Sequence, residues 1–249
     1  KQSLLPVIGK EGQRLLSAAR IAIAGCGALG TAAAQLFARM GVGYIRLIDR
    51  DIVEIDNLHR QFLFDEADAE ASRAKAAAAA EKLAPVNSGV RLEPRVEDIN
   101  ARTAEELLSG VDCIVDGSDN FELRFLLNDF SLKHRIPWTY SGVVGTYGMV
   151  FLFRPEETPC FRCFLPDPPA PGATATCDTA GVFPPTVQAT AALEVSETVK
   201  YLTGRPDALM TSVRYLDMYH GMWKSIPIEY EGEDCPACGR GEYRFLQAR

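Results

Sequence analysis

The sequence predicts an α/β protein with a Rossmann-like, mainly parallel sheet that is covered by helices on both faces. Two observations lead to this prediction. Buried-strand patterns alternate with helix patterns over the first half of the chain, and a glycine-rich turn joins the first strand to the first helix of that series. Alternating strands and helices form parallel sheets, because each crossover helix returns the chain to the same edge. A length of 249 residues suits one large domain or two small ones.

The first elements form a βαβ unit. Residues 20–25 predict a buried strand, residues 28–40 a helix that stops at two glycines, and residues 44–49 a second strand. The elements expected next are a helix over 72–84, strands over 90–94 and 111–116, and a helix over 120–134.

The pattern changes after Pro137. Residues 138–144 and 147–153 are two β-rich runs with no room for a crossover helix, so we expect them to pair antiparallel or to continue as one strand. The elements expected after them are a proline-rich loop over 155–185, a helix over 185–201, and strands over 211–217 and 222–230.

Composition excludes several classes of protein. Lys and Arg number 26 against 33 Asp and Glu, a net charge of −7 that disfavours general binding to nucleic acid or to anionic membranes. No uninterrupted apolar run is long enough to span a bilayer, and no secretory leader opens the chain, although it begins at Lys1 and residues can precede it. The seven cysteines include two Cys-x-x-Cys pairs, which indicates a reducing cytoplasm.

The glycine-rich turn predicts a nucleotide site. Gly25, Gly27 and Gly30 form a G-x-G-x-x-G motif between a strand and a helix, where the backbone can approach a phosphate at the helix N-terminus. Asp49 ends the second strand, which is where an acidic residue accepts hydrogen bonds from ribose hydroxyls. The motif does not distinguish NAD from ATP.

Polar residues beyond the second strand favour a triphosphate. An arginine and a lysine near a phosphate loop suit the charge of ATP, and a carboxylate after the strand at 111–116 can hold Mg²⁺. The residues in question are Asp51, Asn57, Arg60, Gln61, Lys75 and Asp119. Each also has a structural alternative, such as a helix cap at Asp119 or Asn120, or a surface ion pair at Arg60. His59 is expected to be structural.

The two Cys-x-x-Cys pairs predict a closed zinc site. Cys160 and Cys163 form one pair, and Cys235 and Cys238 the other. Four thiolates complete the tetrahedral shell of a structural Zn²⁺, which would tie the tail to the body of the protein. The alternative, a redox pair, needs only one of the two motifs.

Together these motifs resemble the ThiF/MoeB/HesA family, relatives of ubiquitin-activating enzyme. The resemblance rests on GCGALG, DRDIVEIDNLHRQFLF, Lys75, DGSDN and the two cysteine pairs, and it covers nearly the whole chain. It implies that the nucleotide-loop glycines line an ATP pocket together with Asp49, Asp51, Asn57, Arg60, Gln61 and Lys75, and that Asp119 binds Mg²⁺. The family usually has glycine where Ser72 precedes Lys75.

The resemblance also implies a reaction and a partner. A small ubiquitin-like sulfur-carrier protein ending in Gly-Gly would be adenylated at its C-terminal carboxylate, giving acyl-adenylate and pyrophosphate. An ionised carboxylate needs no general base, so catalysis would rest on Arg60, Lys75 and Mg²⁺. Residues 1–249 would form one adenylation domain, with a nucleotide-binding half over about 18–135 and a carrier- and zinc-binding half over about 136–249. No sulfur-transfer domain follows the tail, so another protein would supply the sulfur.

Three further expectations come from the resemblance. Cys177, before a helix in the proline-rich loop, would be a reactive thiol that links to the carrier, the alternative being an inert cysteine. The protein would be a homodimer in which Lys1, in place of the usual arginine, reaches the ATP of its partner. The pathway of the carrier is left open. The rival functions are an NAD-dependent oxidoreductase, an inactive binding module, and a family member that adenylates a peptide or a tRNA base.

Overall fold

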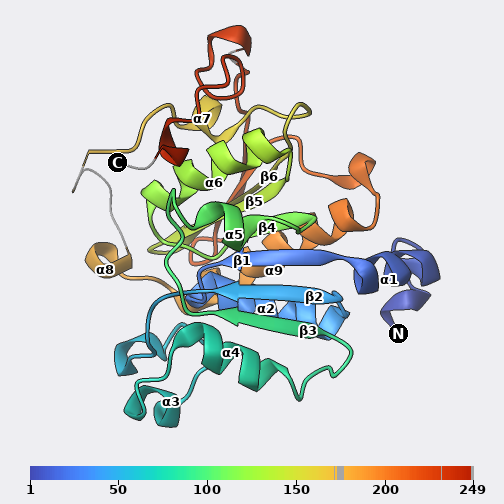
Figure 1. Cartoon of the computed structure of the whole chain (residues 1–249), viewed down its shortest axis with the longest axis vertical. Helices are drawn as coiled ribbons and strands as arrows, with labels where there is room; N and C mark the ends of the chain where they lie inside the picture. Colours follow the sequence, from blue (N-terminus) through green and yellow to red (C-terminus); the bar gives the residue numbers. More distant parts are fainter. Residues whose placement is uncertain (171, 173–176, 231, 248–249) are drawn as a thin grey trace.

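One eight-stranded sheet forms the centre of the protein (Figure 1). The computed structural model describes residues 1–170, 172, 177–230 and 232–247. The strand order is β3-β2-β1-β4-β5-β6-β7-β8, with β1 to β5 parallel and β6 to β8 antiparallel to their neighbours. The strands are β1 (Arg20–Ala24), β2 (Tyr44–Ile48), β3 (Arg91–Arg95), β4 (Cys113–Asp116), β5 (Trp138–Val144), β6 (Tyr147–Phe153), β7 (Val213–Asp217) and β8 (Met222–Ile226). The predicted fold class is confirmed, and so is the antiparallel pairing of β5 with β6.

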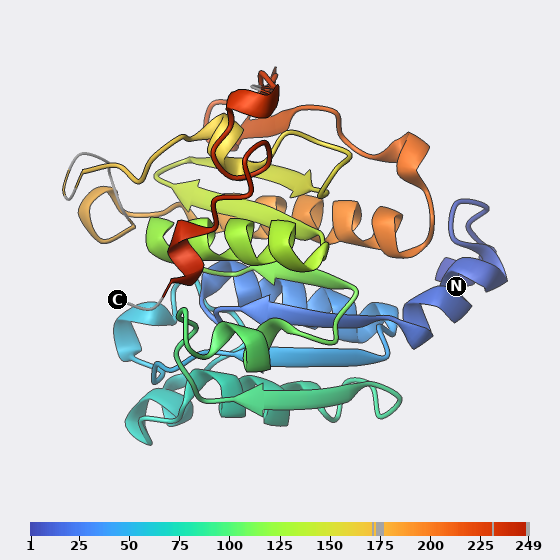
Figure 2. The ribbon, with the colours of Figure 1, turned by 45° about the horizontal axis from the view of Figure 1, so that its top comes forward.

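Helices cover both faces of the sheet (Figure 2). One layer contains α1 (Gly9–Ala18), α2 (Ala28–Met40), α4 (Lys75–Leu83) and α9 (Pro184–Leu202), and the other contains α5 (Ala104–Leu108) and α6 (Phe121–His134). The remaining helices are short: α3 (Glu66–Glu70), α7 (Phe161–Phe164) and α8 (Cys177–Ala180).

Strand β1 shows how the sequence forms these two layers. Ile21 and Ile23 pack into the core beneath α2 and α9, whereas Ala22 and Ala24 pack toward α5 and α6. Successive side chains of a strand point to opposite faces, so a strand buried on both sides reads as continuously apolar. The carboxyl ends of the parallel strands thus meet at one edge of the sheet, where the loops that follow them gather.

Several elements differ from the sequence expectation. Helices α1 and α5 were not foreseen, and the segment at 155–185, expected to be a loop, contains α7 and α8. The helix expected over 72–84 begins only at Lys75, because the residues before it pair with the chain beyond β2. Ile52 and Ala74 form an antiparallel bridge, and the amide of Val53 donates to the carbonyl of Arg73 at 2.8 Å.

No helix in the described part of the chain is both long enough and apolar enough to cross a membrane.

Candidate active site and metal centre

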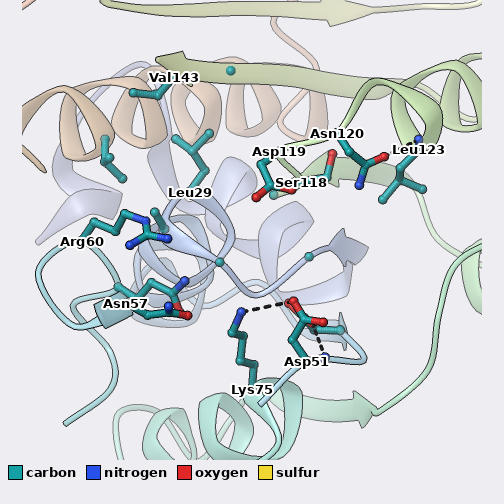
Figure 3. A pocket seen from close by; sticks show the side chains of 18 of the residues that line it. Leu29, Asp51, Asn57, Arg60, Lys75, Ser118, Asp119, Asn120, Leu123 and Val143 are labelled. Carbon is teal, nitrogen blue, oxygen red and sulfur yellow. Dashed lines mark hydrogen bonds and ion pairs between the residues drawn. The ribbon is translucent and has the colours of Figure 1, made fainter. Parts of the chain in front are cut away.

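A cavity of about 800 Å³ opens at the carboxyl edge of the parallel strands (Figure 3). Its walls come from the turns after β1, β2 and β4, from the end of β5, and from the segment that leads to α3. Nine of the predicted nucleotide- and magnesium-site residues line it: Gly25, Gly27, Asp49, Asp51, Asn57, Arg60, Gln61, Lys75 and, as the magnesium candidate, Asp119. The structure therefore brings together residues that span nearly a hundred positions of sequence.

The glycine turn forms the floor of this cavity. Gly25 has φ +102°, in the region that favours glycine, and a Cβ at Gly30 would lie 1.9 Å from the carbonyl oxygen of Gly25. Gly30 is absent from the cavity wall and instead lets α2 pack closely on the strand turn. Gly27 is the N-cap of α2 and supplies no side-chain cap, so the amides of the first turn are available to a phosphate.

Asp49 connects the turn after β2 to the glycine turn through hydrogen bonds. One of its carboxylate oxygens accepts the amide of Cys26 at 2.6 Å, and the other accepts the amide of Asp51 at 2.8 Å. Burial raises the pKa of Asp49, while these two amides and Lys75 oppose the rise. A carboxylate has about four acceptor positions, so Asp49 retains capacity for ribose hydroxyls.

Lys75 reaches the cavity from the first turn of α4. Its ammonium group is buried and lies 3.3 Å from the Asp51 carboxylate, and its amide donates to the carbonyl of Asp51 at 2.8 Å. Ser72, three residues earlier, has φ +47°, which is left-handed backbone and accounts for the glycine usual at this place in the resembling family. The bend at Ser72 directs α4 toward the site.

A tight turn presents three further polar side chains. The amides of Arg60 and Gln61 both donate to the carbonyl of Asn57, at 3.1 and 3.0 Å. Figure 3 shows the Arg60 guanidinium and Asn57 on the side of the cavity next to Lys75 and facing Asp119. Gln61 lines the cavity and is 3% exposed, and its side-chain oxygen has no hydrogen-bond partner among the residues that the structure describes, so a buried acceptor is available there. His59 bonds the carbonyl of Asp56 at 2.8 Å and lies outside the cavity wall, as expected of a structural residue.

The turn after β4 lies across the cavity from the cationic side chains of Arg60 and Lys75 (Figure 3). Asp119 is exposed, and Figure 3 shows it across the cavity from Asp51 and Lys75. Asn120 is the N-cap of α6, and its side-chain oxygen accepts the amide of Leu123 at 2.8 Å. The helix-cap alternative is therefore confirmed for Asn120 and not for Asp119. A carboxylate at this position and an arginine and a lysine opposite suit a magnesium-bound polyphosphate.

Arg124 is a buried charged residue of the cavity wall that sequence reasoning missed. Its side chain is buried on α6, and its Nε donates to Asp116 at 2.9 Å. Its Nη2 donates to the carbonyls of Ser118 and Ser141 at 2.9 and 3.0 Å. Burial raises the pKa of Asp116, and the Arg124 charge opposes that rise. The signal in the sequence was an arginine on the apolar side of an amphipathic helix, one turn after the cap.

The four predicted zinc ligands meet in one cluster. Their sulfur atoms all lie within 4.8 Å of one another, with Cys160 to Cys235 at 3.7 Å and Cys163 to Cys238 at 3.6 Å. A tetrahedral ion with Zn–S bonds of about 2.3 Å separates its sulfurs by about 3.8 Å. The cluster thus fits a closed zinc site between α7 and the tail.

Cys177 begins the four-residue helix α8, not the long helix α9. Its side chain lies outside the described part of the structure, so its reactivity stays a prediction. Cys26 and Cys113, which lie outside the cluster, are fully buried.

The comparisons with known proteins agree with this geometry. The chain is 40% identical over 251 residues to the sulfur carrier protein ThiS adenylyltransferase of Bacillus subtilis, covering 99% of this chain and 72% of that protein. It is 33% identical to a sulfur carrier protein adenylyltransferase of Thermus thermophilus, covering 96% of this chain and 89% of that protein.

Solved structures share the fold. The complex of Escherichia coli MccB with ATP matches with a TM-score of 0.80 at 23% identity, over 92% of this chain and 69% of that one. The profile of the ThiF family matches residues 1–237. The chain therefore belongs to the ThiF family.

Proposed function

We propose that this protein adenylates the C-terminal carboxylate of a small ubiquitin-like sulfur-carrier protein. The observation that supports this most strongly is the cavity, in which a backbone cradle, two cationic side chains and an opposing carboxylate surround one space. The 40% identity to a ThiS adenylyltransferase supports the carrier as substrate rather than a peptide or a tRNA base. An NAD-dependent oxidoreductase explains neither the cations nor the family.

In this reaction the carrier carboxylate attacks the α-phosphorus of ATP. A carboxylate–phosphorus bond forms, the bond to the bridging oxygen of the β-phosphate breaks, and pyrophosphate leaves with the negative charge. The nucleophile is ionised at neutral pH, so no side chain needs to remove a proton. Arg60 and Lys75 offset the charge on the phosphates, and the first-turn amides of α2 hold them in place.

The remainder of the cavity suits an extended chain terminus. Apolar side chains form part of its wall, among them Phe121, Leu123, Val143 and Val182. A terminus ending in Gly-Gly has no side chains to collide with such a wall, so its carboxylate can reach the nucleotide. Mass spectrometry tests this proposal directly: carrier incubated with ATP and enzyme should gain the mass of one AMP, and release of ADP instead would contradict it.

The proposal assigns Mg²⁺ to Asp119. The ion would neutralise phosphate charge, and the exposed carboxylate offers the hard oxygen ligand it prefers. Asp119→Asn should raise the Mg²⁺ concentration for half-maximal activity at least about tenfold, since one anionic ligand becomes neutral. Glu122→Gln is the control, because Glu122 is an exposed acid in the first turn of α6 and does not line the cavity. Equal Mg²⁺ requirements in the two variants would remove Asp119 from the metal site.

The proposed working unit is a homodimer in which Lys1 reaches the partner's phosphates. Within its own chain Lys1 precedes α1 at the amino edge of the sheet, far from the cavity (Figure 1). Gln2 fixes this end by donating to the carbonyl of Met40 at 2.7 Å, while Leu4 and Val7 are 81% and 66% exposed. Exposed apolar side chains at a fixed terminus favour contact with a second copy.

Mixing variants tests the shared site. Lys1→Ala chains and Lys75→Ala chains should each be impaired, and their mixture should regain part of the activity because one site of each mixed dimer is intact. Sedimentation should show a dimer. A monomer at micromolar concentration, or mixed dimers without recovery, would contradict the proposal.

Two related expectations stay predictions: a covalent carrier adduct at Cys177, and sulfur supplied by another protein. A cytoplasmic location likewise rests on cysteine usage alone.

A further inference from the structure

Glu194 is a buried acid with no compensating cation in the described part of the chain. It lies on α9 and is 0% exposed, and among the residues that the structure describes neither carboxyl oxygen has a partner in hydrogen-bonding geometry. Within the described chain no cation forms an ion pair with it. An ionised carboxylate in such a place is costly, so groups of this kind are either paired or uncharged.

The charged groups near Glu194 would not neutralise the negative charge of its ionised carboxylate. Strand β4 contributes Asp116 and Cys113, and α6 contributes Arg124. No charged side chain of α2, β5 or β6 acts on it in the part of the chain that the structure describes. Arg124 is already paired with Asp116 at 2.9 Å, so an ionised Glu194 would be a second negative charge beside a neutral pair. Burial first, and then Asp116, raise the pKa of Glu194 well above its ordinary value.

Ser141 on β5 is the polar side chain close enough to Glu194 to affect its pKa, and together with the Arg124 charge it partly opposes the rise that burial causes. Its only hydroxyl proton is directed to the carbonyl of Asp116, at 2.8 Å. The hydroxyl can therefore offer Glu194 only a lone pair. An ionised carboxylate is itself acceptor-only, whereas a protonated carboxyl group can donate.

We propose that Glu194 keeps its proton in the folded protein and donates it to the hydroxyl of Ser141. The proton completes a chain of donors from α9 through Ser141 to the carbonyl of Asp116, where β4 ends and the turn that carries Asp119 begins. The Ser141 carbonyl also accepts Arg124 at 3.0 Å. Glu194 is thus a positioning residue for the β4 side of the cavity, and this inference holds whichever substrate the cavity takes.

The pH dependence of unfolding tests the proposal. A carboxyl group whose pKa is higher in the folded state binds more protons there, so stability is lost as pH rises above the ordinary carboxyl pKa. Above the ordinary carboxyl pKa, for as long as Glu194 keeps its proton in the folded state, the wild-type folding equilibrium constant should fall about tenfold per pH unit relative to Glu194→Gln, which has no proton to lose. The glutamine variant should be at least as stable as wild type at the highest pH measured. Parallel pH profiles, or a Glu194→Gln variant less stable throughout, would overturn the proposal.

Glu197 provides a matched control one turn along α9. It is equally buried, but Lys200 and the amide of Met210, at 2.5 and 2.7 Å, are its partners. Glu197→Gln should destabilise the full zinc-loaded chain while leaving the wild-type pH slope in place. The same slope change in both variants would contradict a specific role for Glu194.

Infrared difference spectra give a readout that does not depend on stability. The wild-type minus Glu194→Gln spectrum at neutral pH should show the carbonyl stretch of a protonated carboxylic acid, and this band should shift in a Ser141→Ala background. An absent band would refute the proton, and an unshifted band would refute Ser141 as its acceptor.

Discussion

Replacing Lys75 by alanine should lower ATP–pyrophosphate exchange about 100- to 1,000-fold. Lys75 is a buried cation of the cavity wall, and its ammonium group lies 3.3 Å from the Asp51 carboxylate. Removal of one preorganised donor to developing phosphate charge costs roughly 10²- to 10³-fold in rate. Exchange at saturating carrier and ATP is the measurement, with thermal unfolding as the check on folding.

Lys82→Ala is the matched control for this prediction. Lys82 lies on the same helix and also pairs with aspartates, Asp65 and Asp68, but it is outside the cavity wall. Its loss should change exchange only a few-fold. Comparable losses in the two variants would mean that Lys75 acts through the stability of α4 and not through ATP.

Cys238→Ser should abolish zinc binding and strongly destabilise the protein. The four sulfurs are arranged for a closed ion, and the ion would tie the tail to α7. The chain after the cluster docks on α6, where Asp129 accepts the amide of Phe245 at 2.9 Å. Loss of a structural metal is among the changes that cost about 4 kcal/mol or more.

Metal analysis and denaturant unfolding check this prediction. Wild-type protein should contain about one zinc per chain, and Cys113→Ala, which removes a buried thiol outside the cluster, should keep it. Full zinc content in Cys238→Ser, or unchanged stability after zinc loss, would contradict a stabilising site.

Local motifs made the fold class and the two sites predictable. Alternating strand and helix patterns fix a parallel sheet, and the carboxyl ends of its strands must share an edge, so Asp49 and Asp119 were expected near the glycine turn. The cysteine pairs predicted the metal site, because a spacing of two residues lets both thiolates of a pair bind the same ion.

The features that the sequence did not predict depend on contacts between distant segments. The start of α4 at Lys75 reflects the bridge between Ile52 and Ala74, which no local propensity encodes. Arg124 is a site residue only because β4 and β5 present Asp116 and Ser141 to it. The packing role of Gly30 appears only when α2 lies against the turn after β1.

The most direct measurement of the central claim is ATP–pyrophosphate exchange with a purified carrier ending in Gly-Gly and with the same carrier lacking its last glycine. If the cavity joins a carrier carboxylate to AMP, exchange should require the intact carrier and Mg²⁺, and NAD should not compete with ATP. Exchange that is equal without the carrier, or tight binding of NAD in place of ATP, would contradict it.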